Sequence, residues 1–268
     1  MASRTRPFAA FEFLIAWRYL RARRAEGGVS VMTWISLVGI ALGVMALVAT
    51  LAVRAGFRAE FVDTILGANA HVTVYRGSYV DEQGVTTRGM ADFAEVRDRV
   101  AAVPGVTRAA PVVRGQAMVT LNDRSNVAEV YGISLGDLKT IPRVAGSSEA
   151  LGDIERFGEG IAVGSGIARD LGLMVGDKVK LISPSGAKTA FGVSPRVNAY
   201  EVVYIFSAGR WDIDRTRIYM PFTEAQSYFN REGAADEIEI YVADPESVDA
   251  LAMPLLTAGG ENTLIWTW

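Results

Sequence analysis

The longest hydrophobic segment of the chain covers residues 29–53, a run of 25 residues without a charged side chain. As an α-helix this run would be roughly 37 Å long, enough to cross a hydrocarbon core of ~30 Å. A buried core helix is the alternative, but uncharged runs of this length are typical of membrane spans. A cleaved signal peptide fits poorly, because the run is too long and begins nearly 30 residues into the chain. The pattern therefore predicts a transmembrane helix over residues 29–53.

The segment before this run, residues 8–24, has the pattern of an amphipathic helix. Phe8, Phe11 and Ile15 recur at helical spacing, and the end of the segment is rich in arginine. We expect a helix that lies in the membrane interface, within a cytoplasmic segment of residues 1–28. An ordinary basic flank of the span is the alternative interpretation.

Charge is distributed unevenly on the two sides of the predicted span. Residues 1–28 contain six arginines and two glutamates, whereas the whole chain has a net charge of −3. The positive-inside rule therefore places the N-terminus in the cytoplasm and residues 54–268 outside it. A basic N-terminal segment joined to an acidic body also argues against a nucleic-acid partner.

Inside the predicted span, Gly39 and Gly43 form a small-xxx-small pattern that allows another helix to pack closely. Such patterns also arise by chance in spans rich in glycine and alanine. The pattern favours a helix with partners over a simple anchor.

The remainder of the chain alternates between strand and helix patterns. We predict a first module with strands at residues 71–75, 112–121 and 127–133 and a helix at 92–103. A second, β-rich region inserted at about residues 134–235 has predicted strands at 161–163, 178–183, 200–206 and 217–221 and helices at 165–171 and 223–229. A strand at 237–242 and a helix at 245–256 complete the first module. The expected fold is a membrane-anchored α+β protein with two interleaved subdomains.

Composition excludes most kinds of catalytic site. The chain has no cysteine and a single histidine, His71, which excludes thiol catalysis, disulfides and multi-histidine metal sites. No G-x-x-x-x-G-K-[ST] phosphate loop is present. The acidic pairs Asp212/Asp214 and Glu237/Glu239 are interpreted as the solvent-facing sides of strands. We therefore predict no catalytic residues, no metal site and no cofactor.

The segment between the strands at 178–183 and 200–206 is a candidate binding site. It is too long for a tight hairpin, and Pro184 and Pro195 make it stiffer than a Gly/Ser linker. Phe191 lies near its tip beside Gly192, and the cations Lys188 and Arg196 flank it. These residues suit docking onto a partner protein. A surface hairpin whose phenylalanine folds back onto the sheet is the alternative.

Several motifs of the chain resemble the LolC/LolE family, the membrane subunits of the bacterial lipoprotein-releasing ABC transporter. The resemblance extends from residue 11 to the C-terminus. It is carried by W-R-Y-L-R-A-R-R (17–24), S-L-V-G-I-A-L-G-V-M-A-L-V (36–48), G-F-R-A-E-F (56–61), G-V-x-R-A-A-P-V (105–112) and T-x-F-G-x-x-P-R (189–196). A further motif, L-G-L-x-V-G-D (171–177), is shared with the wider class of efflux permeases that have a MacB-like periplasmic core.

The resemblance implies a function in lipoprotein export. Family members extract acylated lipoproteins from the inner membrane, powered by a separate ATPase subunit, LolD, and pass them to the periplasmic carrier LolA. In LolC-type members a hook captures LolA, and by position the hook is residues 184–196 here. Thr189, Gly192 and Pro195 match the hook pattern, Phe191 replaces another large apolar residue, and Val193 stands where a cation often occurs.

The resemblance also implies a lipid-binding role for the first span. In the family this helix lines the cavity for the acyl chains, so Leu47, Leu51, Val53 and Phe57 are the expected wall of that cavity. A second permease subunit, identical or paralogous, is expected as a partner.

One departure from the family is large. Family subunits have four spans, three of them after the periplasmic domain, whereas this chain ends at residues 263–268, where we expect the return to the membrane to begin. We interpret the chain as a partial one. The alternatives are a permease of the related efflux or cell-division type, a single-span periplasmic sensor or binding domain and, last, an anchored hydrolase.

Overall fold

The computed structural model describes residues 10–21, 27–77, 79–80, 86–87, 89–184, 186, 188–189 and 192–267. The chain divides into two units, residues 1–60 and 61–268, and the division falls inside one long helix. Each unit is described by itself.

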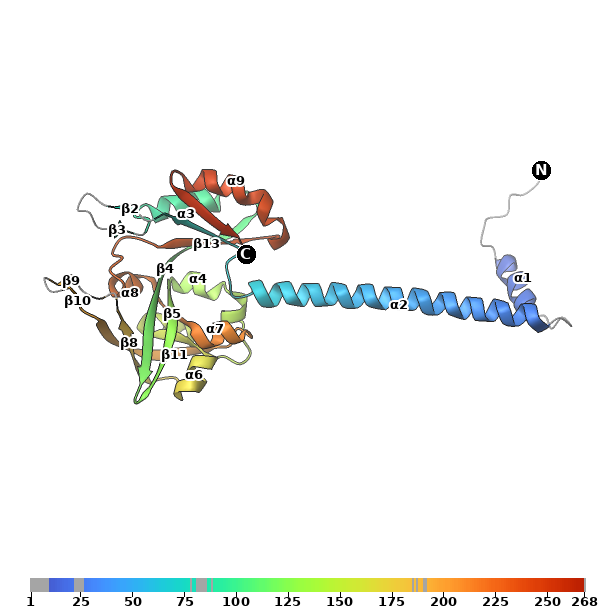
Figure 1. Ribbon diagram of the computed structural model, residues 1–268, viewed down its shortest axis with the longest axis horizontal. Coiled ribbons are helices and arrows are strands. Elements are labelled where there is room, and N and C mark those ends of the chain that lie inside the picture. Colours follow the sequence, from blue (N-terminus) through green and yellow to red (C-terminus); the bar gives the residue numbers. More distant parts are fainter. Residues whose placement is uncertain are drawn as a thin grey trace. The chain divides into compact units, whose positions relative to one another are not determined.

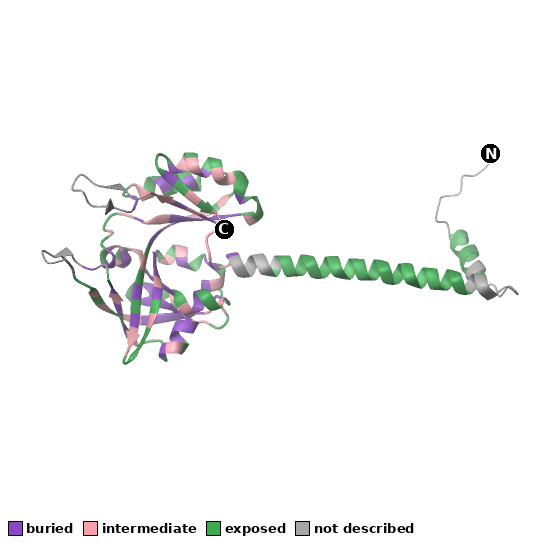
Figure 2. Cartoon of the chain, viewed as in Figure 1, coloured by how far each residue is buried: buried purple, intermediate pink, exposed green. Residues whose placement is uncertain are grey.

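The N-terminal unit consists of helix α1 (Ala10–Arg21) and most of helix α2 (Gly27–Leu66) (Figure 1). Residues Val31–Arg58 of α2 are long and apolar enough to cross a membrane, and their side chains are exposed (Figure 2). The helix continues 13 residues beyond the predicted end at Val53, to Leu66. The physical reason is that charged residues such as Arg54 end the apolar run without breaking the helical hydrogen bonds.

The folded unit is built on a mixed β-sheet. Strands are ordered β14-β1-β13-β4-β5-β12-β7-β11-β6, and β8 pairs with both β11 and β4. The strands of this sheet are β1 (Val72–Arg76), β4 (Val106–Leu121), β5 (Arg124–Ile133), β6 (Leu151–Gly152), β7 (Ile161–Gly164), β8 (Lys178–Ser183), β11 (Arg196–Phe206), β12 (Arg217–Pro221), β13 (Glu237–Val242) and β14 (Thr263–Thr267). Two small hairpins lie outside it, formed by β2 (Tyr79–Val80) with β3 (Thr86–Thr87) and by β9 (Lys188–Thr189) with β10 (Gly192–Val193).

Short helices cover this sheet. They are α3 (Phe93–Ala101), α4 (Leu135–Lys139), α5 (Pro142–Ala145), α6 (Ser165–Leu171), α7 (Trp211–Thr216), α8 (Phe222–Tyr228) and α9 (Val248–Gly259), with the 3-10 helices η1 (Ile154–Glu159) and η2 (Pro245–Ser247). Helices α3 and α9 pack beside β1, β13 and β14, whereas α4 to α8 pack on the remaining strands (Figure 1).

Strand β4 is shared between two subdomains. Its first half pairs with β13, and its second half, from Val113 onward, pairs with β5. We define the first subdomain as β1, β13, β14, α3, α9 and the first half of β4, and the second subdomain as residues 113–235. The first has a core of valine and isoleucine side chains around Val74 and Ile238, and the second has two cores, on either face of its sheet.

This sharing changes the predicted boundary of the inserted region. The sequence placed its start at about residue 134, whereas the pairing of β4 with β5 and β8 brings residues 113–133 into the second subdomain. The predicted strand at 112–121 alternates, but this pattern does not indicate which strands it pairs with.

The C-terminal end also differs from the prediction. Residues expected to begin a return to the membrane form β14, an edge strand that pairs antiparallel with β1. The segment is short and apolar, and a strand pattern this short cannot be told from the start of a span by composition alone.

Candidate functional site

The predicted hook projects from the second subdomain between two paired strands. Strands β8 and β11 are antiparallel, with Ser183 opposite Arg196, and the arm of residues 184–195 extends beyond this pair. Within the arm, β9 and β10 form a small hairpin with Thr189 opposite Gly192 (Figure 1). Pro184 and Pro195 are exposed at its two ends, and Lys188 belongs to β9. Phe191 lies outside the described residues.

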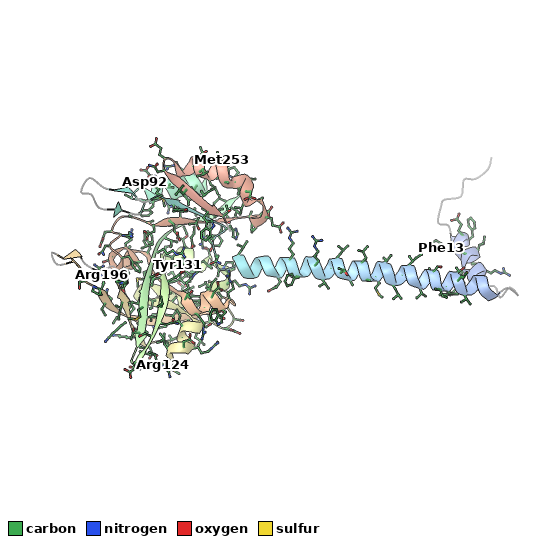
Figure 3. All side chains as sticks on the ribbon, in the orientation of Figure 1. Phe13, Asp92, Arg124, Tyr131, Arg196 and Met253 are labelled. Carbon is green, nitrogen blue, oxygen red and sulfur yellow. The ribbon has the colours of Figure 1, made fainter. Side chains whose placement is uncertain are left out.

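The base of the arm is fixed to the turn after α8. Arg196 lies at the base of the arm (Figure 3). Its guanidinium donates to the Ser227 carbonyl and, at 2.9 Å, to Oδ1 of Asn230. The amide of Asn230 in turn donates to the Gly186 carbonyl at 3.0 Å. Arg196 was predicted as a carrier-binding residue, and these contacts assign its side chain to holding both ends of the arm in place.

Close packing at this base requires a glycine. A Cβ placed on Gly186 would lie 1.8 Å from the Ser194 carbonyl oxygen and 2.6 Å from the Arg196 amide nitrogen. Both are backbone atoms, which cannot move aside without opening the arm.

We therefore expect Gly186→Ala to loosen the arm and weaken any binding that depends on it by tenfold or more. Hydrogen exchange should accelerate at the amides of residues 183–198 and stay unchanged in β1 and β13. Gly158→Ala is the matched control, because no atom of the described residues lies within 4 Å of its added Cβ. Equal exchange in the arm of both variants would contradict the prediction.

A hydrogen-bonded chain supports the strand that follows the arm. Asn198 donates to the Tyr200 hydroxyl at 3.0 Å, and this hydroxyl donates to Glu224 of α8 at 2.6 Å. Burial and the Glu224 carboxylate raise the pKa of Tyr200, so the phenol remains a donor at physiological pH. The Tyr200 ring also packs edge-on against Tyr228, with the centroids 6.0 Å apart. The arm is thus carried by a rigid platform.

An apolar row crosses the outer face of the sheet beside the arm. Val127, Met118, Ile182 and Val197 are successive cross-strand neighbours on β5, β4, β8 and β11. Val127 is 64% exposed, Met118 40% and Val197 53%. Single exposed apolar residues are ordinary, but a contiguous group is typical of an interaction surface. Sequence reasoning missed this row because its members come from four strands.

The predicted acyl-chain residues are exposed along α2 but do not share one face. Leu47 and Leu51 lie one turn apart, as do Val53 and Phe57. At about 100° per residue, the two pairs spread over about 160° of the helix circumference. A continuous wall of an acyl-chain cavity can therefore contain only one of these two pairs.

The glycine pair in the same helix is open on the side where a second helix could approach. No atom of the described chain lies within 4 Å of a Cβ placed on Gly39 or Gly43. Close helix packing there remains a prediction.

The acidic pairs have structural roles. Asp212 forms an ion pair with Arg210, and the buried Asp214 accepts the Ala208 amide at 2.7 Å. The expectation that Glu237 and Glu239 face solvent is wrong, because Glu239 is only 8% exposed. These two carboxylates face Arg108 of the first subdomain and Arg114 and Arg217 of the second. Across the described ranges, no group of three or more metal-ligating side chains is placed to hold an ion.

Comparison with known proteins identifies the domain. Residues 33–257 match the family of the MacB-like periplasmic core domain. The chain is 31% identical over 264 residues to the lipoprotein-releasing system transmembrane protein LolC of Neisseria meningitidis serogroup B, covering 96% of this chain and 60% of that protein. It is 25% identical over 262 residues to the protein LolE of Haemophilus influenzae, covering 96% and 61%. The chain thus spans about three fifths of the length of these curated relatives.

Solved structures with a similar chain path have lower identity. The periplasmic region of MacB from Actinobacillus actinomycetemcomitans has a TM-score of 0.47 and 12% identity, covering 78% of this chain and 94% of that one. The extracellular domain of the transporter YknZ from Gram-positive bacteria has a TM-score of 0.45 and 13% identity, covering 73% and 99%. The family match and the curated relatives together establish that this chain is a membrane-anchored α+β protein with a MacB-like periplasmic core domain and belongs to the LolC/LolE family.

Proposed function

We propose that this chain is a permease subunit of an ABC transporter that extracts lipoproteins from the inner membrane and passes them to the periplasmic carrier LolA. The observation that carries the proposal is the arm of residues 184–195, a projecting hairpin whose base is fixed by Arg196 and Asn230. The apolar row beside it extends the surface that a partner protein could contact. The names of the relatives supply the transport system to which such a surface belongs.

The proposed orientation follows from charge and hydrophobicity. The arginine-rich N-terminal segment lies in the cytoplasm, α2 crosses the inner membrane, and residues 61–268 lie in the periplasm. In this orientation the arm faces the compartment of a soluble carrier. The proposal includes an interfacial location for α1, whose phenylalanine, leucine and tryptophan side chains are exposed.

Energy for transport is proposed to come from a separate, LolD-like ATPase subunit, because the sequence has no phosphate-binding loop of the Walker type. A second permease subunit, identical or paralogous, would pack against α2 at Gly39 and Gly43. Acyl chains of the lipoprotein would contact one of the two apolar pairs on α2, and Val53 with Phe57 lie nearer the periplasmic end.

The test is binding of LolA to the full chain in lipid nanodiscs. We expect micromolar binding by the wild type, at least tenfold weaker binding by Phe191→Ala, and no binding after residues 184–196 are replaced by a short Gly/Ser turn. Met174→Ala is the control. Met174 is exposed and lies just before the start of β8, whereas the arm follows the end of that strand. A wild-type chain that does not bind LolA would exclude carrier docking and favour a permease of the efflux type.

A further inference from the structure

Strand β14 forms an open edge of the large sheet. It pairs antiparallel with β1 and, within the described residues, has no strand on its other side. Its sequence, T-L-I-W-T, contains no charged residue and no proline, the residues that commonly prevent strand pairing at an edge. The opposite edge, β6, has only two residues, and one of them is Gly152, with a φ of 92°. Strand β14 is therefore the edge of this sheet that can accept a further strand.

The side chains of β14 alternate between a buried and an exposed face. Thr263 is only 9% exposed, and Ile265 packs against the core of the first subdomain. On the other face, Leu264 is 48% exposed and Trp266 is 70% exposed. A strand added beside β14 would place every second side chain next to Leu264 and Trp266.

A cavity of about 820 Å³ lies at the first residues of β14. Its lining includes Arg76 at the end of β1, Asp92 just before α3, and residues 261–264. Nη2 of Arg76 donates to Oδ2 of Asp92 at 2.7 Å. Nε of Arg76, Oδ1 of Asp92 and Oγ1 of Thr263 are buried, and none of them has a hydrogen-bond partner among the described residues. The cavity thus contains an unused donor, an unused acceptor and an unused hydroxyl.

These three atoms indicate which ligand the cavity suits. Nε of Arg76 can only donate a hydrogen bond, and the Asp92 carboxylate can only accept one. A simple anion would satisfy the first but be repelled by the second, and a simple cation would do the reverse. A carboxamide both donates and accepts, and the Thr263 hydroxyl can pair with either of its ends. Because buried polar atoms are normally paired, the cavity suits an asparagine or glutamine side chain.

The cavity and the arm lie at the same end of the folded unit. Asp92 of the cavity and Arg196 at the base of the arm mark this end in Figure 3. The other end of β14, at Thr267, lies opposite Val72, where the chain enters the sheet. A peptide paired with β14 would therefore run toward the end of the folded unit from which the arm projects.

We propose that β14 and this cavity bind an extended polypeptide segment of the transported lipoprotein. The segment pairs with the open edge of β14 and places a carboxamide side chain in the cavity. Main-chain hydrogen bonds are the same for every sequence, so this mode of binding suits cargo proteins whose sequences differ. A second copy of β14 would fit the cavity less well, because T-L-I-W-T contains no carboxamide. The inference rests on the proposed function, which supplies the lipoprotein.

The first test is binding of a fluorescein-labelled peptide, K-V-T-V-N-V-T-V-K-amide, to the full chain in nanodiscs. We expect saturable binding by the wild type and binding weakened tenfold or more by Trp266→Lys, because a lysine on an edge strand opposes strand addition. Met253→Lys on α9 is the matched control, since Met253 is 69% exposed, and it should bind within twofold of the wild type. Equal binding by Trp266→Lys and the control would overturn the proposal.

N-methylation of the peptide tests for main-chain pairing. Neighbouring residues of a strand direct their N–H groups to opposite edges, and only one edge of the peptide faces β14. A methyl group on the amide of the sixth or of the seventh peptide residue should therefore weaken binding tenfold in one case and less than threefold in the other. Equal effects of the two methyl groups would exclude strand addition.

The cavity is tested with a second peptide in which valine replaces the asparagine. Asp92→Ala should weaken binding of the asparagine peptide to the level of the valine peptide and leave the valine peptide within twofold. Thr263→Val is the second variant, in case near-UV circular dichroism shows that Asp92→Ala is unfolded, and we expect a smaller loss confined to the asparagine peptide. Equal weakening of both peptides by the folded variants would overturn the assignment of the carboxamide.

The occupant of β14 in the transporter is tested by crosslinking. With p-benzoylphenylalanine in place of Trp266, in the transporter assembled with its ATPase, its partner permease and a lipoprotein, we expect a crosslink to the polypeptide of the lipoprotein. A crosslink to a second permease copy, or within this chain, would overturn the proposed occupant. A chain that binds LolA but not the peptide would overturn this inference alone. A chain that binds the peptide but not LolA would contradict the proposed function instead.

Discussion

Replacement of Glu239 by alanine is expected to destabilise the folded unit by about 3–5 kcal/mol, because it leaves buried arginines without their counter-charge. The Glu239 carboxylate lies 3.7 Å from Arg108 and also interacts with the charges of Arg217 and Arg114. Arg108 cannot turn to solvent easily, since its guanidinium donates to the Asp137 carbonyl at 2.8 Å and lies 4.0 Å from the centre of the Tyr241 ring. The cost therefore reflects an uncompensated charge rather than lost packing.

Denaturant unfolding of the full chain in detergent, followed by near-UV circular dichroism, measures this loss. Glu129→Ala is the matched control, because Glu129 also pairs with an arginine of this region, at 3.2 Å from Arg114, but in an exposed pair. Its effect should stay between about 0 and 1 kcal/mol. Similar losses for the two variants would contradict the assignment of Glu239 to a buried ionic cluster.

The helices and strands could be predicted well where the spacing of apolar residues agreed with the residues that end an element. The predicted helix at 165–171 and the strands at 178–183, 217–221 and 237–242 coincide with α6, β8, β12 and β13. Gly172, with a φ of 72°, ends α6 in the left-handed conformation that glycine adopts readily. The short helices α4, α5 and α7 were missed, because four to six residues carry too little periodicity to identify a helix.

Non-local features explain the other differences. Whether Glu239 faces water depends on which subdomain covers β13, and the alternating sequence at 237–242 is the same in either case. The same argument applies to β4, which pairs with β13 along its first half and with β5 along its second. Alternation of apolar and polar residues shows that the two faces of a strand differ. It does not show which part of the protein covers each face.

The candidate site was likewise predictable only in part. Its position in the chain could be predicted from Pro184, Pro195 and the family pattern at 189–196. The contacts that hold the arm in place could not be predicted, because Arg196 and Gly186 are held by Ser227 and Asn230, more than 30 residues away along the sequence. Asn230 has a φ of 55°, and asparagine is among the residues that tolerate this conformation, which could have drawn attention to that turn. The arm was therefore predictable as a segment, and its rigid base was not. Binding requires a fixed arm, which Arg196 and Tyr200 provide through contacts with α8 and the turn after it.

Substitution of Glu237 by glutamine is expected to stabilise the folded unit at alkaline pH and to have little effect at acidic pH. Burial and the neighbouring Glu239 raise the pKa of Glu237 to about 7, above its ordinary value of 4.5, although Arg114 opposes the shift. The folded protein thus binds a proton that the unfolded chain has already released between these pH values, so the wild type loses stability as the pH rises from about 4.5 to 7. Glutamine resembles the protonated carboxyl and carries no such dependence.

The difference in unfolding free energy between Glu237→Gln and the wild type should therefore grow from near zero at pH 4.5 to at most about 3 kcal/mol at pH 8. Taking this difference cancels the opposite contribution of His71, whose pKa is lowered by burial and which favours the folded state as the pH rises. Denaturant titrations at half-unit intervals between pH 4.5 and 8.5 would measure it. A difference that is constant with pH would mean that Glu237 titrates normally and that its surroundings on β13 are open to water. A growing difference would mean that water is excluded from the carboxylates of Glu237 and Glu239 on this strand.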